Sequence, residues 1–259
     1  MSVVLQPSYQ LFVAGETIPL QTLSWHLARN ETAPLPVAWI FLLGGDVSKV
    51  GKATGLLEKI CNEVGKQLAS TNYGVVTGMD MISPVLLGSA FNAFNEIFKS
   101  SNSPGNLKDY VRYYNLYPGR DIPQELQSGT TITINSAKQD RLYAAITTYP
   151  NAAIVIGGDD TTFDMAFRCL QAGRPVFPVV ESGGAAKRLY DLLLEEYEYK
   201  SENSFETQFA HIKADLSKIY QHPLDVKALD QPFKSAIAEI ISHLNMIFVP
   251  DDPRMYAQE

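Results

Sequence analysis

The sequence predicts an α/β protein with a Rossmann-like, doubly wound parallel sheet. Apolar runs without charges, such as AAIVI (152–156), are typical of strands that are covered on both faces. These runs alternate with segments of helical periodicity, which favours parallel strands joined by crossover helices. Glycine pairs directly follow two of the runs, at 44–45 and 157–158.

The first 36 residues are predicted to form a separate N-terminal hairpin and connector. The stretch SYQLFVAGETIPL contains two short strand-like runs around an Ala-Gly-Glu turn, which indicates a hairpin. The following LQTLSWHLARN is expected to form a short helix or turn, and ETAPLPV a proline-bearing connector.

The main domain is predicted over residues 37–200 and begins with a buried strand at 37–45. A helix is expected over 54–70, because its apolar side chains recur at helical spacing. The next elements expected are a strand and turn at 72–79, a helix at 83–98, a strand at 110–118, and a short strand or β-like loop at 130–135.

The stretch 140–180 carries the clearest pattern of the chain. It predicts a helix, the strand 152–156, a Gly-Gly turn, a helix from about 163 to 172 that Gly173 closes, and a strand that Pro175 opens. Another helix is expected from about 184 to 197.

Residues 201–259 are predicted to form a C-terminal helical extension packed on the same domain. Its clearest element is an amphipathic helix at 232–247, whose apolar side could be core or an oligomer interface. The apolar residues of that side are Phe233, Ile237, Ile240, Ile241 and Leu244.

Composition excludes several classes of function. A net charge of -7 argues against a general nucleic-acid binder, which needs a basic surface. No apolar run reaches the about 18 residues of a membrane span, and the N-terminus lacks the pattern of a secretory signal. We therefore expect a cytoplasmic protein, with Cys61 and Cys169 as reduced thiols.

The sequence predicts neither a metal nor a resident cofactor, because its four histidines lack metal-ligand spacing. A P-loop and a GxSxG nucleophile elbow are also missing. The tyrosines at 110, 113, 114 and 117 are interpreted as packing around a strand, with base stacking as the alternative.

Three strand-end turns are expected to converge at the carboxyl edge of the sheet, where such sheets bind ligands. Backbone N–H groups at a glycine turn and a helix N-terminus favour an anion, so a nucleotide or phosphate site is predicted here. The candidate ligand-binding residues are Gly44, Gly45, Asp46, Thr77, Gly78, Met79, Arg141, Gly157, Gly158, Asp159, Asp160, Thr161, Thr162, Asp164, Glu181, Gly183, Gly184 and Lys187, with Arg120 and Arg188 as further anion contacts.

Structural alternatives exist for these residues. The glycines could serve packing alone, and the aspartates at 159 and 160 could be turn formers. The threonines at 161 and 162 could be N-caps, and Asp164 a first-turn carboxylate that favours the helix dipole. Arg141 could pair with Asp140 or Glu181, and Lys187 and Arg188 could be solvated helix residues.

IGGDDTTFD (156–164) resembles the PGGxGTxxE signature of the LOG family, the lysine decarboxylase-like phosphoribohydrolases. In that family an arginine precedes the signature by fifteen residues, and Arg141 stands fifteen residues before Ile156. The segment GRPVFPVVESGGAAKRLYDLL (173–193) is similar to another branch of the superfamily, the SLOG ligand-sensing domains of Thoeris-type antiphage proteins. The resemblance covers about residues 37–195.

The chain departs from the LOG signature at four positions. Ile156 replaces the proline, Asp160 a glycine, Asp164 the glutamate, and Leu142 the lysine that follows the family arginine. By resemblance, Arg141 and Asp164 would be the catalytic pair of an enzyme. The shorter Asp164 misplaces its carboxylate by about 1 Å, which can cost on the order of a hundredfold in rate.

The resemblance therefore implies a sensor or regulatory subunit for a nucleotide or ADP-ribose-like, NAD-derived ligand, cyclic forms included, in antiviral signalling. It also implies a homo-oligomer, a dimer or tetramer, with a separate effector protein as partner. Nucleic acid and membrane are not expected as partners, because of the net charge and the lack of a long apolar run. Two alternatives remain. One is a nucleotide N-glycosidase, phosphoribohydrolase or deoxyribosyltransferase-like enzyme, and the other is a structural subunit that binds no nucleotide.

Overall fold

The computed structural model describes residues 10–13, 16–19, 36–45, 54–78, 81–101, 107–115, 129–135, 150–198, 216–222 and 224–249. Its centre is a parallel sheet with the strand order β6-β5-β4-β3-β7-β8. The strands are β3 (Trp39–Leu43), β4 (Gly74–Gly78), β5 (Val111–Asn115), β6 (Thr130–Asn135), β7 (Ala152–Ile156) and β8 (Val176–Val179). The predicted Rossmann-like fold class is confirmed.

The strand order changes direction between the parallel neighbours β3 and β7. It winds outward from β3 through β4 and β5 to β6, then returns to the other side of β3 for β7 and β8. Such a reversal is a topological switch point, the place where open α/β sheets bind ligands at the carboxyl ends of their strands.

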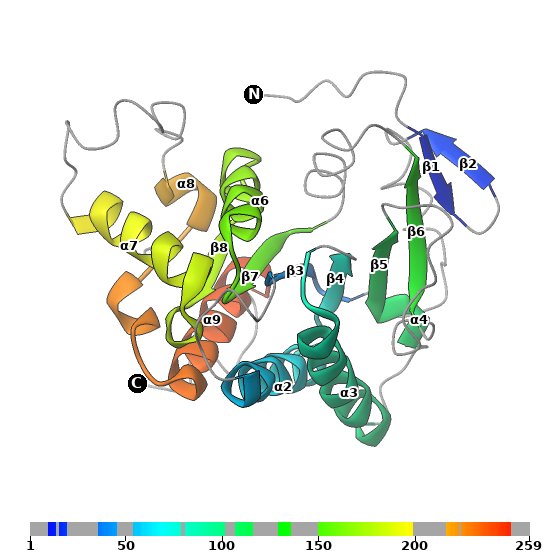
Figure 1. Ribbon diagram of the computed structural model, residues 1–259, viewed down its shortest axis with the longest axis horizontal. Helices are drawn as coiled ribbons and strands as arrows, with labels where there is room; N and C mark the ends of the chain where they lie inside the picture. Colours follow the sequence, from blue (N-terminus) through cyan, green and yellow to red (C-terminus); the bar gives the residue numbers. More distant parts are fainter. Residues whose placement is uncertain are drawn as a thin grey trace.

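The N-terminal hairpin belongs to the same sheet. Strands β1 (Gln10–Val13) and β2 (Glu16–Pro19) pair with each other in antiparallel register, and β1 also pairs antiparallel with β6. The hairpin therefore extends the parallel sheet at the β6 edge, as Figure 1 shows at the blue end of the chain.

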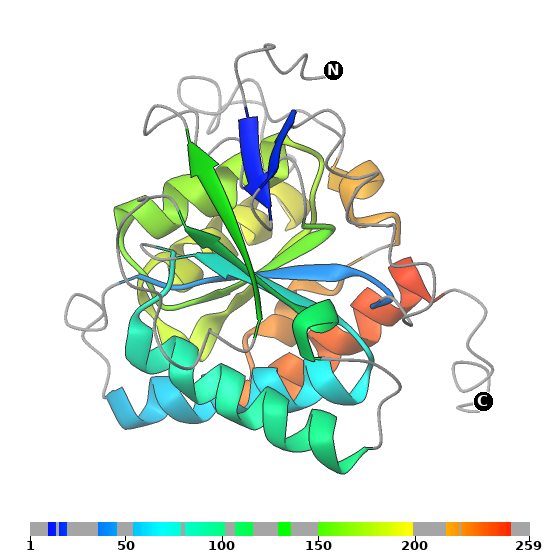
Figure 2. The same ribbon diagram turned by 90° about the vertical axis from the view of Figure 1, so that its right-hand side faces the viewer.

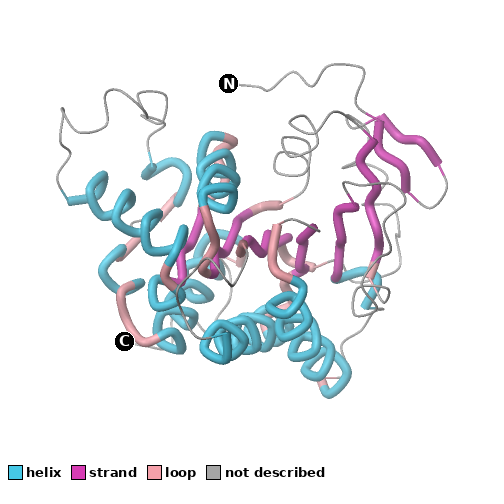
Figure 3. Tube along the Cα trace, viewed as in Figure 1, coloured by secondary structure: helices cyan, strands magenta, loops and turns pink. Residues whose placement is uncertain are grey.

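Helices cover both faces of the sheet (Figures 2 and 3). On one face lie α2 (Thr54–Ser70), α3 (Pro84–Ser100) and α9 (Phe233–Phe248), and on the other α6 (Asp160–Gln171) and α7 (Gly184–Glu198). Helix α6 begins about three residues earlier than its apolar pattern predicts. The helix expected before β7, which would carry Arg141, falls outside the described residues.

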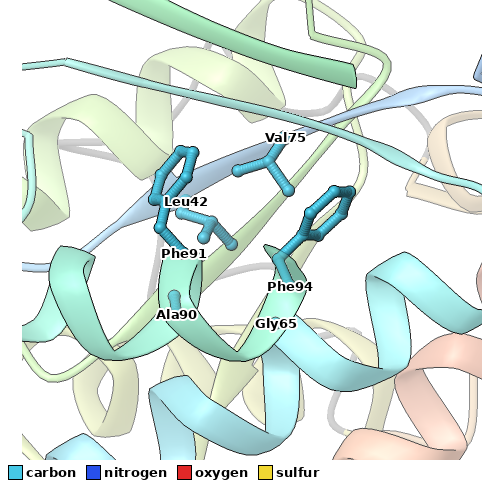
Figure 4. A pocket seen from close by; sticks show the side chains of 6 residues that line it. All are labelled: Leu42, Gly65, Val75, Ala90, Phe91 and Phe94. Carbon is cyan, nitrogen blue, oxygen red and sulfur yellow. The ribbon is translucent and has the colours of Figure 1, made fainter. Parts of the chain in front are cut away.

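Helices α2 and α3 are in close contact at Gly65. A Cβ atom at this position would lie 2.1 Å from the backbone oxygen of Ala90, so a side chain here would force the helices apart. Between this crossing and the sheet lies a small apolar hollow, which Leu42, Val75, Phe91 and Phe94 line together with these two residues (Figure 4). The hollow has no room for a water molecule and lies in the core rather than at the strand ends.

The C-terminal extension completes the core beside β8. The side chains of Ile237, Ile240, Ile241 and Leu244 are buried within the single chain, so this side of α9 is core rather than an interface. The described tyrosines of the predicted run, at 110, 113 and 114, are also buried, which confirms packing for these three.

Tyr220, in the short helix α8 (Leu216–Tyr220), covers the edge strand β8. Its hydroxyl accepts from Val176 N at 3.3 Å and donates to Val176 O at 2.5 Å, and its ring contacts Phe177 edge-on. His243 of α9 is 1% exposed and lies with Nε2 3.3 Å from the Tyr220 carbonyl oxygen. Covering the edge in this way blocks pairing with another strand.

In the described part of the chain, no helix is long and apolar enough to cross a membrane.

Candidate functional site

The glycine turns that follow β3 and β7 pack directly on each other at the switch point. A Cβ atom at Gly44 would lie 2.6 Å from the Ile156 oxygen, and one at Gly45 would lie 3.1 Å from Gly158 Cα. A Cβ at Gly45 would also lie 2.8 Å from Thr162 Oγ1. Both turns therefore need glycine for close backbone approach, and the predicted convergence of these two turns is present.

The turn after β8 joins them. A short 3-10 turn (Val180–Ser182) leads to Gly184, which has φ +57°. A Cβ atom at Gly184 would lie 2.3 Å from Gly158 O. Ser182 Oγ accepts from Gly157 N at 2.7 Å and donates to Val179 O. Backbone and hydroxyl contacts thus fix the β7 turn against the β8 turn.

The first N–H groups of α7 are used within this assembly. Ala185 N donates to Gly158 O at 2.9 Å, and Ala186 N donates to Gly157 O at 3.1 Å. A helix N-terminus usually offers such donors to an anion. Here they hold the turn after β7 instead, so α7 contributes less to an anion site than its Gly183-Gly184 start predicts.

The N-terminus of α6 carries its own anion. The carboxylate of Asp159 accepts from Thr161 N at 3.1 Å and Thr162 N at 3.3 Å, and its backbone oxygen accepts from Phe163 N at 3.0 Å. This is an N-cap, and it explains why α6 begins at Asp160. The carboxylate occupies the position that a ligand phosphate would take on these donors.

The β4 turn is linked to the β3 turn. Thr77 is fully buried, and its hydroxyl donates to Leu42 O at 3.2 Å. Gly44 N donates to Met81 O at 2.7 Å, and a Cβ atom at Gly78 would lie 2.6 Å from the Met81 sulfur. The Thr77 hydroxyl therefore joins neighbouring strands.

Charged side chains surround the start of α6. Arg188 of α7 pairs with Asp160, and its guanidinium lies 4.5 Å from the centre of the Phe163 ring. The pair is exposed, at 54% for Arg188 and 93% for Asp160. Arg188 is thus a cation within reach of the first turn of α6.

Three other predicted residues make contacts within the fold. Asp164 accepts from Arg168 Nε at 2.7 Å, one turn along α6, and Lys187 pairs in the same way with Asp191 on α7. Glu181 Oε2 accepts from Phe233 N at 2.7 Å and so caps α9. These contacts give each residue a structural partner, and their role toward a ligand stays a prediction.

The structure brings together the described turn residues of β3, β7 and β8. Asp46, Met79, Arg120 and Arg141 lie outside the described residues. Sequence reasoning missed Ser182, which holds the β7 turn; its signal was a small polar residue between a strand end and a Gly-Gly pair.

Neither a metal cluster nor a reactive thiol is seen in the described ranges. These ranges hold no group of three or more histidine, cysteine, aspartate or glutamate side chains that could bind a metal ion. Cys61 and Cys169 are free and buried. Burial raises the pKa of the Cys169 thiol to about 12, so it is protonated at neutral pH and a poor nucleophile.

No known protein family and no curated protein matches the chain. Among solved structures, a structural-genomics target designated TM1055 is similar, with 19% identity, a TM-score of 0.44, and coverage of 60% of this chain and 81% of that one. A molybdenum cofactor carrier protein from Chlamydomonas reinhardtii is similar with 15% identity, a TM-score of 0.44, and coverage of 73% of this chain and 100% of that one.

Proposed function

We propose that the chain binds a nucleotide or ADP-ribose-like ligand at the carboxyl ends of β3 and β7, and acts as a sensor or regulatory subunit. The observation that supports this most is the switch point itself, where the glycine turns after β3, β7 and β8 interlock. Because Gly45 and Gly158 lack side chains, the turns and the first turn of α6 pack together at this point of the sheet. Ligands of open α/β sheets bind at this location.

Arg188 is the described cation best placed to hold a phosphate. It lies over Phe163 and pairs with Asp160 at the first residue of α6. An exposed ion pair of this kind contributes only about 0–1 kcal/mol. A phosphate would therefore replace Asp160 at small cost.

The donors of α6 are available only in competition with Asp159. Releasing the cap costs about 0.5–2 kcal/mol, which a phosphate on Thr161 N and Thr162 N would have to outweigh. We infer that binding would displace the Asp159 carboxylate from these two donors.

A sensor is favoured over a hydrolase by the position of Asp164. Its side chain is 53% exposed and its carboxylate pairs with Arg168 on the same helix, whereas catalysis requires a carboxylate oriented on the substrate. An NAD-derived signal and a role in antiviral defence extend this proposal and depend on the resemblance described above.

The first experiment combines binding with product analysis. The protein is mixed with AMP, ATP, NAD, ADP-ribose and cyclic ADP-ribose isomers, its thermal shift is recorded, and each mixture is analysed by chromatography. We expect one ligand to stabilise the fold, by about 2.7 kcal/mol at a hundred times its Kd, and to be recovered unchanged. Released base would overturn the sensor in favour of an N-glycosidase, and no shift with any ligand would overturn nucleotide binding.

Arg188→Gln locates the site. We expect it to weaken binding about fivefold or more, because a unit charge about 4 Å from a phosphate is worth about 1 kcal/mol in water. Arg168→Gln, which removes an arginine of α6 that pairs with Asp164, is the matched control and should bind like the unaltered chain. Equal losses in both variants would contradict a phosphate beside Arg188.

Two substitutions of Asp159 separate its effect on ligand affinity from its effect on stability. Asp159→Asn keeps an N-cap oxygen and removes the charge, so it should leave stability nearly unchanged and tighten phosphate binding about fivefold. Asp159→Ala should cost about 1 kcal/mol of unfolding free energy. Weaker binding in Asp159→Asn would mean instead that the carboxylate itself contacts the ligand.

A further inference from the structure

A buried arginine lies at the opposite, amino-terminal end of the sheet. Arg112 of β5 is 6% exposed, and within the described ranges no carboxylate pairs with it. Burying a cation without a paired anion is unfavourable. The position therefore needs an explanation that the strand-end site does not give.

Three neighbouring strands build the surroundings of Arg112 near their amino-terminal ends. The guanidinium lies 4.7 Å from the centre of the Trp39 ring, on β3. That ring packs on Gly74 of β4, where a Cβ atom would lie 2.6 Å from Trp39 Cε3. Gly74 thus makes room for the tryptophan, and the tryptophan offers its face to the arginine.

The hydrogen bonds of Arg112 engage one side of its guanidinium. Nη1 donates to the carbonyl oxygen of Lys108, in the short helix α4 (Leu107–Tyr110), and weakly to that of Val111 at 3.4 Å. Nε is buried and has no hydrogen-bond partner in the described part of the chain. The edge formed by Nε and Nη2 is one that binds a carboxylate or phosphate through two parallel hydrogen bonds.

We propose that Arg112 and Trp39 form a second binding site, which takes the carboxylate or phosphate group of a small ligand at the amino-terminal end of the sheet. The oxyanion supplies the negative charge and the acceptor that the buried Nε lacks. Trp39 contacts the face of the guanidinium by a cation–π interaction, which leaves the edge formed by Nε and Nη2 for the anion. The site is independent of the nucleotide proposed at the strand ends.

Trp39 fluorescence gives a direct test. The chain has two tryptophans, so Trp39 reports alone in a Trp25→Phe background. Inorganic phosphate and acetate are titrated separately, with sodium chloride keeping the ionic strength constant. We expect a saturable change with at least one of them, and the stronger of the two identifies the group as phosphate or carboxylate.

Two variants show whether the fluorescence change comes from Arg112. Arg112→Lys keeps the charge and loses the planar guanidinium, so it should bind about tenfold more weakly. Arg168→Gln, which removes an arginine of α6 that pairs with Asp164, should bind like the parent. An unchanged response in Arg112→Lys, or no saturable response to either anion, would overturn the proposal.

A measurement on the unaltered chain covers the case in which Arg112→Lys fails to fold. The Nε–H resonance of Arg112 should shift on addition of the anion that changes Trp39 fluorescence, because that proton gains an acceptor. If the resonance stays in place while the fluorescence changes, the anion binds elsewhere and the proposal fails.

Discussion

Gly184→Ala tests the packing of the strand-end turns. Gly184 has φ +57°, and a Cβ atom there would lie 2.3 Å from Gly158 O and 3.2 Å from Gly157 C. An alanine in the left-handed conformation costs about 1–2 kcal/mol, and overpacking against a fixed backbone costs about 1–3 kcal/mol more. We expect a loss of about 2–5 kcal/mol, a large part of the about 5–15 kcal/mol that stabilises a typical domain.

Gly173→Ala is the matched control, since Gly173 has φ +75° and no atom within 4 Å of an added Cβ. It should lose only the conformational part, about 1–2 kcal/mol. Urea denaturation gives both values, and an unchanged m-value shows that the variants are comparable. If Gly184→Ala loses no more than Gly173→Ala, the β7 and β8 turns are not in close contact, and the site built on them is wrong.

Three further predictions concern the scaffold. Gly65→Ala should lower the free energy of unfolding by about 1–3 kcal/mol, because its Cβ would lie 2.1 Å from a backbone oxygen of α3. Gly55→Ala, whose Cβ would have no atom within 4 Å, should raise that free energy by up to about 1 kcal/mol. Urea denaturation of the two variants compares these values. Tyr220→Phe should cost about 1–3 kcal/mol in the same assay, because it removes the partner of Val176 N and O. Burial lowers the pKa of His243, so the unfolded chain takes up a proton first and stability falls as the pH drops below about 6.5. His243→Phe should flatten that pH profile, and an equal slope would contradict the assignment.

The parts of the fold that follow from local pattern were predictable. Strand β7 is a charge-free run between a helix pattern and a Gly-Gly pair, and β8 follows the glycine that closes α6. Periodicity and turn residues act over a few residues, so the sequence carries them directly. The start of α6 was predicted too late, because the Asp159 cap leaves no trace in the apolar pattern.

The roles of polar side chains depend on partners that are distant in the sequence. Glu181 reaches Phe233 N across 52 residues, and Ser182 reaches Gly157 N across 25. The Trp39 ring lies under Arg112 because β4 brings β3 and β5 to its two sides. The local sequence does not indicate these partners. The Glu181 carboxylate, predicted as a ligand contact, therefore also caps α9 in the structure.

The two helix N-termini at the strand ends differ in what a ligand could change. In α7 the donors hold the β7 turn through backbone carbonyls. In α6 the donors bind the Asp159 carboxylate, and Arg188 pairs with Asp160, so both contacts come from side chains that a ligand anion can replace. Under the proposed function, a phosphate would uncap α6 and release Arg188 while the turns stay fixed. A ligand shifts an equilibrium only through its different affinity for two states, and under the proposed function these states are the first turn of α6 with its side-chain contacts and without them.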